Sequence, residues 1–222
     1  MNEQQLALKY KPTLYFDKAE PFDIKGMGVT VFHEPGKSPS FRRTIEFDPE
    51  TVEFAIEYAV YFDYDIQHLY DLEHIWIFVS RNGDVVDAEA SFHGKYLKAL
   101  ALNCGETISG QHVELYCQPG KHAFLPQGNL FRLIPDWNSS CNRFAGSDGL
   151  LIADMFEKEL SATPGLNNKI EKYIKTNFSF SPTLQFESKD LDDALFMPWK
   201  ALKQIVPGRI EHEIMRINDS RQ

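Results

Sequence analysis

The sequence lacks the long apolar run that a membrane-spanning helix requires. None of its hydrophobic stretches approaches the roughly 20 residues that cross a bilayer. The opening residues, MNEQQLALKYKP, also lack the apolar stretch of a secretory signal peptide. These two absences lead us to expect a cytoplasmic protein without a transmembrane segment.

Positive charge is scarce as well. The chain has 23 Lys and Arg against 32 Asp and Glu, for a formal net charge of −9. Its basic residues are scattered and form no stripe of the kind that displaces counterions from nucleic acid phosphates. We therefore expect no nucleic acid partner.

Cysteine is also rare, with three residues in an odd set that has no metal-ligand spacing. A disulfide framework is not expected in a protein of this size. Cys104, Cys117 and Cys141 are predicted to be reduced thiols, and a single Cys104–Cys141 bridge is the alternative.

The chain does contain enough apolar material for a core, since 43% of its 222 residues are hydrophobic and 13% are aromatic. Domains near this length often fold as one unit. We expect a single domain over residues 1–222. Its β-sandwich core would span residues 1–150, and a mainly helical extension over residues 151–222 would pack on that core.

Strand-forming patterns dominate the first half of the chain. A short helix is predicted over residues 2–9, and β-rich segments bounded by Pro and Gly follow it: TLYFD, GVTVF and RRTIEFD. In residues 52–65, apolar side chains alternate with polar or small ones, which predicts a strand with one buried face.

A hairpin is predicted next, because both Asn82 and Gly83 can take the positive φ angles of a tight turn between residues 73–80 and 85–93. A further strand is expected over residues 112–118. Five or more strands at this spacing predict an α+β, mainly β protein with an antiparallel β-sandwich core and flanking and C-terminal helices.

Apolar residues take a helical spacing beyond about residue 150. One helix is predicted around Leu151 to Phe156 and another around Ile170. The last apolar stretch, residues 202–217, contains Pro207, which removes a backbone donor, and Gly208, which loosens a helix. We predict two short helices there.

The densest group of ligand-type residues lies between two predicted strands, in YFDYDIQHLYDLEHIW. His68, Asp71 and Glu73 can converge in such a loop without long-range help. Carboxylate oxygens suit Ca²⁺, Mg²⁺ or Mn²⁺, and an imidazole moves the preference toward Mn²⁺, Zn²⁺ or Fe. The cluster therefore predicts a divalent-cation site; a charged surface loop without metal is the alternative.

Strand alternation adds a second group of polar side chains. Glu89 and His93 share one face of their strand, as His112 and Glu114 do of theirs. If these faces adjoin the cation loop, they form an acidic cleft where Glu89, His112 and Glu114 bind substrate and His93 serves as ligand, acid or base. The alternative is that they form the solvated side of an antiparallel sheet.

Three segments carry a resemblance to a known family: EYAVYFDYDIQHLYDLEHIWIFV, GDVVDAEASFHGKY and GQHVELYCQPGKHAFLP. In this order they resemble the necrosis-inducing protein family and the related vacuolar sorting-associated proteins. The matching motifs are His68-x-x-Asp71-x-Glu73, His93-Gly94 and His122-Ala123. The resemblance covers about residues 51–126.

The resemblance implies a β-sandwich with flanking helices and an acidic pocket that holds a divalent cation, either Ca²⁺ or Mg²⁺. Its ligands would be Asp65, His68, Asp71 and Glu73, with Asp63 in reserve for Asp65. The chain departs from the family pattern between these ligands, at Gln67, Leu69, Tyr70 and Leu72.

The necrosis-inducing relatives are secreted toxins that bind sphingolipid head groups. We do not expect toxin activity here, because no export signal is visible and the C-terminal helical extension lies outside the match. Recognition of a polar, small-molecule or glycan-like ligand through the metal-organised pocket is favoured, since no nucleophile elbow or phosphate loop is visible. The alternatives are a metal-dependent hydrolase in which His93 or His122 transfers protons, and a purely structural metal site.

Overall fold

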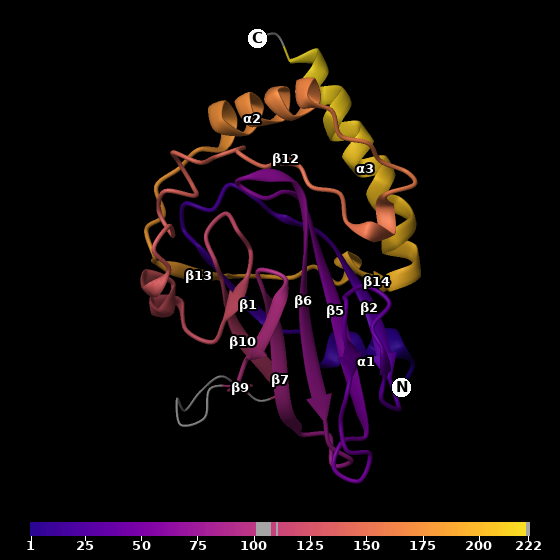
Figure 1. The fold of residues 1–222 in the computed structure, drawn as a ribbon. Coiled ribbons are helices and arrows are strands. Elements are labelled where there is room, and N and C mark those ends of the chain that lie inside the picture. Colours follow the sequence, from indigo (N-terminus) through magenta and orange to yellow (C-terminus); the bar gives the residue numbers. More distant parts are fainter. Residues whose placement is uncertain (101–107, 110, 221–222) are drawn as a thin grey trace.

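The computed structural model describes residues 1–100, 108–109 and 111–220. Two sheets form the centre of this part of the chain (Figure 1). The five-stranded sheet has the order β11-β10-β1-β13 with β9 beside β10, where the strands are β1 (Thr13–Asp17), β9 (Ile108–Ser109), β10 (His112–Cys117), β11 (Phe124–Leu125) and β13 (Phe186–Lys189).

The seven-stranded sheet has the order β14-β2-β5-β6-β7-β8, with β12 beside β6. Its strands are β2 (Ile24–Phe32), β5 (Phe54–Tyr64), β6 (His68–Val79), β7 (Val85–Phe92), β8 (Lys95–Lys98), β12 (Gly149–Leu150) and β14 (Phe196–Pro198). A separate short ribbon pairs β3 (Gly36–Lys37) with β4 (Thr44–Ile45).

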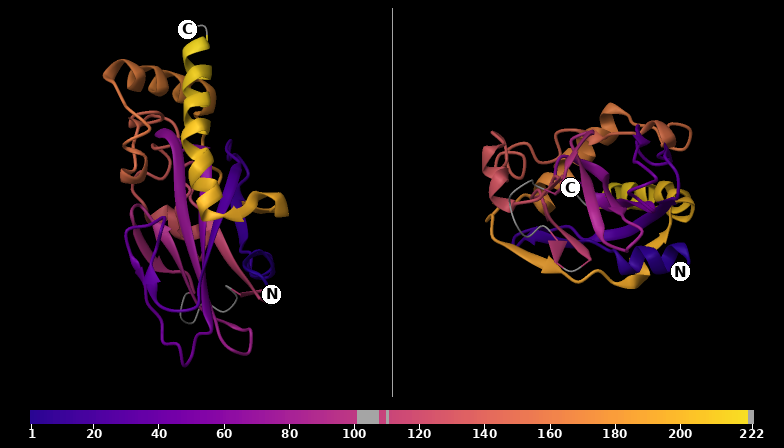
Figure 2. Two further views of the ribbon diagram at one scale, coloured as in Figure 1. Left: turned by 90° about the vertical axis from the view of Figure 1, so that its right-hand side faces the viewer. Right: turned by 90° about the horizontal axis from the view of Figure 1, so that it is seen from below.

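The helices lie around these sheets (Figure 2). They are α1 (Glu3–Lys9), α2 (Pro164–Phe178) and α3 (Trp199–Asp219), with the 3-10 turns η1 (Gly128–Leu133), η2 (Asp154–Phe156) and η3 (Asp193–Leu195). The two sheets share one apolar core, in which the rings of Phe16 and Phe62 meet edge to face at 6.4 Å. The predicted α+β, mainly β sandwich with flanking helices is thus confirmed.

Strands β5, β6 and β7 form the antiparallel meander that the sequence predicts, with Tyr58 opposite Ile75 and Ile75 opposite Ala90. The turn before β7 differs from the prediction, because only Gly83, at φ 83°, has a positive φ angle. Strand β6 also begins five residues earlier than predicted. His68 to Glu73 are therefore strand residues and not a loop.

Both faces of β5 are buried, contrary to the predicted polar face. One face meets the five-stranded sheet. The other face of β5 is covered by α3 and by the segment that carries β3 and β4. This segment buries a second apolar cluster around Trp76. Helix α3 approaches β2 closely because Gly28 has no side chain: a Cβ there would lie 2.8 Å from a ring carbon of Trp199.

Three sequence predictions about local elements are wrong. RRTIEFD supplies only the two-residue strand β4, and the region around Leu151 to Phe156 has the short turn η2 in place of a helix. Helix α3 runs unbroken through Pro207. Buried Val206 and Ile210 lie on either side of the proline, so packing on both sides outweighs the loss of one backbone hydrogen bond.

Residues 151–222 also supply β13 and β14 to the two sheets. The pairings β1–β10, β2–β14 and β6–β12 are parallel, whereas the remaining ones are antiparallel. Within the described residues, no helix is long and apolar enough to cross a membrane. Burial raises the thiol pKa of both Cys117 and Cys141, and Cys104 lies outside the described residues.

Candidate metal centre

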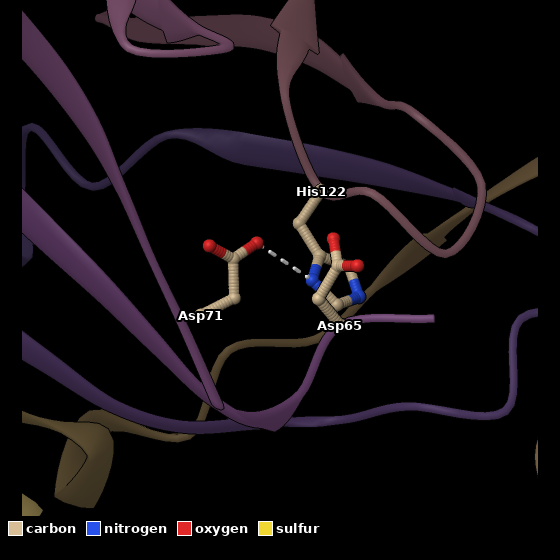
Figure 3. Close-up of side chains that lie close together, drawn as sticks. All are labelled: Asp65, Asp71 and His122. Atoms are coloured by element: carbon tan, nitrogen blue, oxygen red, sulfur yellow. Dashed lines mark hydrogen bonds and ion pairs between the residues drawn. The ribbon is translucent and has the colours of Figure 1, made fainter. Parts of the chain in front are cut away.

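Three chain segments meet at one end of the sandwich and bring together Asp65, Asp71 and His122 (Figure 3). Asp65 directly follows β5, Asp71 lies in β6, and His122 lies in the loop between β10 and β11. One ligand atom from each of the three residues lies within 4.8 Å of the other two. The cluster thus combines two predicted cation ligands with a histidine predicted to transfer protons.

His122 is fully buried, and its ring stacks on that of Phe62 at a centroid distance of 3.8 Å. Its Nδ1 lies 3.1 Å from Asp71 Oδ2, whereas its Nε2 has no hydrogen-bond partner within the described structure. Burial lowers the pKa of the imidazole, but the Asp71 and Glu20 carboxylates outweigh burial and raise the pKa to about 9.

Glu20, in the connection between β1 and β2, belongs to the same cluster, and sequence reasoning missed it. Its Oε1 lies 3.6 Å from His122 Nε2, so it acts on the ring through its charge and not through a hydrogen bond. Its Oε2 accepts a hydrogen bond of 2.7 Å from the backbone N–H of Gly120. No sequence pattern marks this residue, because its partners lie 100 positions away.

Asp65 is 1% exposed and already has several positive or donating neighbours. Its Oδ1 accepts hydrogen bonds from the Gln67 backbone N–H at 2.6 Å and from Lys121 Nζ at 2.9 Å. His68 Nε2 lies 3.7 Å from the same oxygen. Burial opposes ionisation of Asp65, yet the charges of His68 and Lys121 hold its pKa below the usual value.

Glu73 lies two residues beyond Asp71 on β6, so both side chains project from the same face of the strand. It accepts a hydrogen bond from the Ser91 hydroxyl. Burial, followed by the negative charges of Asp71 and Asp65, raises the pKa of Glu73 well above its usual range. The surroundings of Glu73 therefore provide too little positive charge to stabilise its ionised form.

The cluster has more acids than bases. Four carboxyl groups, those of Glu20, Asp65, Asp71 and Glu73, lie near three basic side chains, those of His68, Lys121 and His122, and the raised pKa of Glu73 favours its protonated form. Buried charges in proteins are paired or coordinate metals. Carboxylate oxygens, a nearby imidazole and the unpartnered buried nitrogen of His122 together fit a divalent cation.

The structure does not bring the other predicted site residues into this cluster. His93 lies in the β7–β8 turn at φ 50°, and its Nε2 lies 2.8 Å from Gln118 Oε1. Glu89 is opposite Trp76, on the other face of β6, and forms ion pairs with Arg43 and Lys98.

The two predicted residues on β10 lie in the five-stranded sheet. His112 Nδ1 lies 2.8 Å from the carbonyl oxygen of Lys11, and Glu114 accepts a hydrogen bond of 3.2 Å from the Tyr15 hydroxyl. The strand faces that carry Glu89, His112 and Glu114 therefore do not form one acidic cleft with Asp65.

No protein-family model matches the chain, and the search of curated proteins found no match. Solved structures of similar fold include NLPPya in complex with glucosamine (18% identity, TM-score 0.36) and with mannosamine (18%, 0.35). Each of these matches covers 55% of this chain and 65% of the other, so the chain spans less than two thirds of those proteins.

A further match is the necrosis and ethylene inducing protein 2 from the causal agent of cocoa's witches' broom disease. Its identity is 20% and its TM-score 0.35, over 67% of this chain and 85% of that one. These neighbours come from the group that residues 51–126 resemble. The resemblance to vacuolar sorting-associated proteins stays a prediction.

Proposed function

We propose that this chain binds a divalent cation through Asp65, Asp71 and Glu73, with His68 and His122 as nitrogen ligands at the same centre. The observation that supports this most strongly is the convergence of ligand atoms from Asp65, Asp71 and His122 within 4.8 Å of one another, together with the buried Nε2 of His122, which has no hydrogen-bond partner among the described residues. A hard cation, Ca²⁺ or Mg²⁺, suits the oxygen-rich set, and the imidazoles make Mn²⁺ and Zn²⁺ the alternatives.

Such a cation would connect the β5–β6 segment that carries Asp65 to Glu73 with the loop of residues 118–123, and Asp71 and His122 are 51 positions apart in the sequence. Asp71 and His68 keep side-chain exposures of 13% and 14%. The centre is therefore open to solvent on this side, which favours recognition of a small polar or sugar-like ligand beside the cation. Glucosamine and mannosamine, the ligands of two structural neighbours, are suitable first probes.

The geometry gives less support to a metal-dependent hydrolase. A general acid or base must reach the reacting group of a substrate. His122 is fully buried between two carboxylates, and His93 is held against Gln118 outside the cluster. Binding is therefore the function that we propose.

The test is to strip the protein with a chelator and measure melting curves and binding heats with Ca²⁺, Mg²⁺, Mn²⁺ and Zn²⁺. At about 100 times the dissociation constant, a cation that binds only the folded state adds about 2.7 kcal/mol of stability. Asp71→Asn should remove this gain. Glu114→Gln, which alters a carboxylate outside the cluster, should retain it.

Two results would contradict the proposed function. One is a melting temperature that stays constant with all four cations, together with no bound metal in elemental analysis of the untreated protein. The other is an equal cation response in Asp71→Asn and in the parent protein.

A further inference from the structure

Lys121 places a positive charge inside the candidate centre. Its side chain is 12% exposed, and its Nζ lies 2.9 Å from Asp65 Oδ1. Among the contacts of the described residues, this carboxylate oxygen is the hydrogen-bond acceptor of the ammonium. Burial lowers the pKa of Lys121, but Asp65 more than offsets this and raises it above the usual value, so the side chain is charged at neutral pH.

The ammonium and a divalent cation would need the same carboxylate. Asp65 is almost fully buried, and its Oδ1 already accepts hydrogen bonds from Lys121 and from the backbone N–H of Gln67. A cation coordinated by Asp65 would lie a few ångströms from the ammonium, and two positive charges at such a separation repel strongly in a poorly solvated site. The Lys121 ammonium and a divalent cation therefore cannot both bind Asp65 without a loss of favourable electrostatic energy.

We propose that the Lys121 ammonium is a built-in competitor of the divalent cation: it neutralises Asp65 when the cation is absent and leaves when the cation binds. This inference rests on the proposed function. It explains why the cluster can remain folded with several buried acids close together. The intrinsic cation affinity of the acids is then reduced by the cost of displacing Lys121.

The Lys121 side chain can move to polar surroundings when a cation displaces it from Asp65. Lys121 is flexible and keeps contact with solvent through its exposed fraction. Asp148 is an exposed carboxylate whose charge already acts on Lys121. An ammonium that leaves Asp65 therefore moves toward water and toward a second acid, and not into an apolar surrounding.

The experiment compares the parent protein with Lys121→Met after removal of metal by a chelator. Lys121→Met should melt at a lower temperature than the parent without cation, because Asp65 loses its counter-ion. It should bind Ca²⁺ or Mg²⁺ at least tenfold more tightly in calorimetry, and its melting temperature should rise more on saturation. Lys121→Gln, which keeps a hydrogen-bond donor without charge, should change in the same direction.

Lys11→Met is the matched control, because Lys11 forms an ion pair of 3.0 Å with Asp193 away from the cluster. Its cation affinity should equal that of the parent. If Lys121→Met and Lys121→Gln bind the cation no more tightly than a parent that does bind it, the competitor role is wrong and the proposed function stands. If the parent and both variants bind none of the four cations, both proposals fail.

Discussion

Two histidines in this protein are equally buried but have opposite ionisation behaviour. His74 is 1% exposed, and burial lowers its pKa to about 3. His122 is fully buried as well, yet its pKa is raised to about 9. Since burial alone disfavours an imidazolium, the neighbours decide the outcome.

The surroundings of the two rings differ in their charge. His74 Nε2 lies 2.9 Å from the Ser40 hydroxyl, and the nearby Glu57 carboxylate accepts its hydrogen bonds from Ser40 and from Trp76. His122 instead lies between the carboxylates of Asp71 and Glu20. Near His74 the Glu57 carboxylate is satisfied by neutral hydrogen-bond donors, whereas two carboxylates face the ring of His122 directly.

The largest expected effect on the free energy of unfolding comes from removing a buried positive charge in the region around His74. Arg43 is 6% exposed in its side chain, forms an ion pair of 2.6 Å with Glu89, and lies over the rings of Trp76 and Tyr96. Arg43→Met should lower the free energy of unfolding by about 3 kcal/mol, because it leaves a buried carboxylate with one partner fewer. Urea unfolding measures this loss.

The neighbouring Arg42 provides the control. It also pairs with an acid, Asp154, but its side chain is 82% exposed. Arg42→Met should therefore change the free energy of unfolding by no more than about 0.5 kcal/mol. Equal costs for Arg42→Met and Arg43→Met would mean that the ion pair around Glu89 does not stabilise this region.

A smaller effect is expected from the ionisation of His74. Its folded pKa, about 3, lies below the value of about 6.5 in an unfolded chain, so the unfolded state takes up the proton first as the pH falls. Stability that is present above pH 6.5 is therefore lost in acid. The parent should lose about 2 kcal/mol more than His74→Phe between pH 7 and pH 5.

Urea unfolding of both proteins across this range gives the difference directly, since other titrating groups are shared. Between pH 7 and pH 8 the difference between them should stay constant. A difference that is also constant down to pH 5 would show that His74 is protonated in the folded protein.

The smallest effect is expected where a predicted site residue lies outside the cluster. Glu114 is half-buried and accepts one hydrogen bond from Tyr15. Glu114→Gln should change the free energy of unfolding by about 0.5 kcal/mol or less. A loss above about 2 kcal/mol in urea unfolding would contradict this prediction, because it would mean that the Glu114 carboxylate stabilises the fold by more than one hydrogen bond from Tyr15.

The parts of the fold that the sequence predicts well are those set by neighbouring residues. Apolar alternation in residues 52–65 and the turn at Gly83 predict the meander of β5, β6 and β7, and a helical period around Ile170 predicts α2. The break at Pro207 was predicted from local chemistry too, but packing on both sides of the proline keeps α3 continuous.

The candidate site divides in the same way. His68, Asp71 and Glu73 lie close together in the sequence, so their grouping could be predicted from spacing, and the family resemblance added Asp65. Glu20 could not be found in this manner, because its contact with Gly120 spans 100 positions. The pairing of Lys121 with Asp65 depends likewise on how a distant loop returns to the end of β5.

The order in which the strands pair has a consequence for synthesis of the chain. Strand β1 lies between β10 and β13, and β2 takes β14 as a neighbour, so the earliest strands receive partners from segments made near the end. Contacts of such long sequence separation form slowly, and an unpaired strand edge readily joins another chain. A ribosome-bound intermediate that ends before residue 186 would therefore carry bare edges in both sheets, and nascent chains of this protein should depend on protection from aggregation until β13 and β14 emerge.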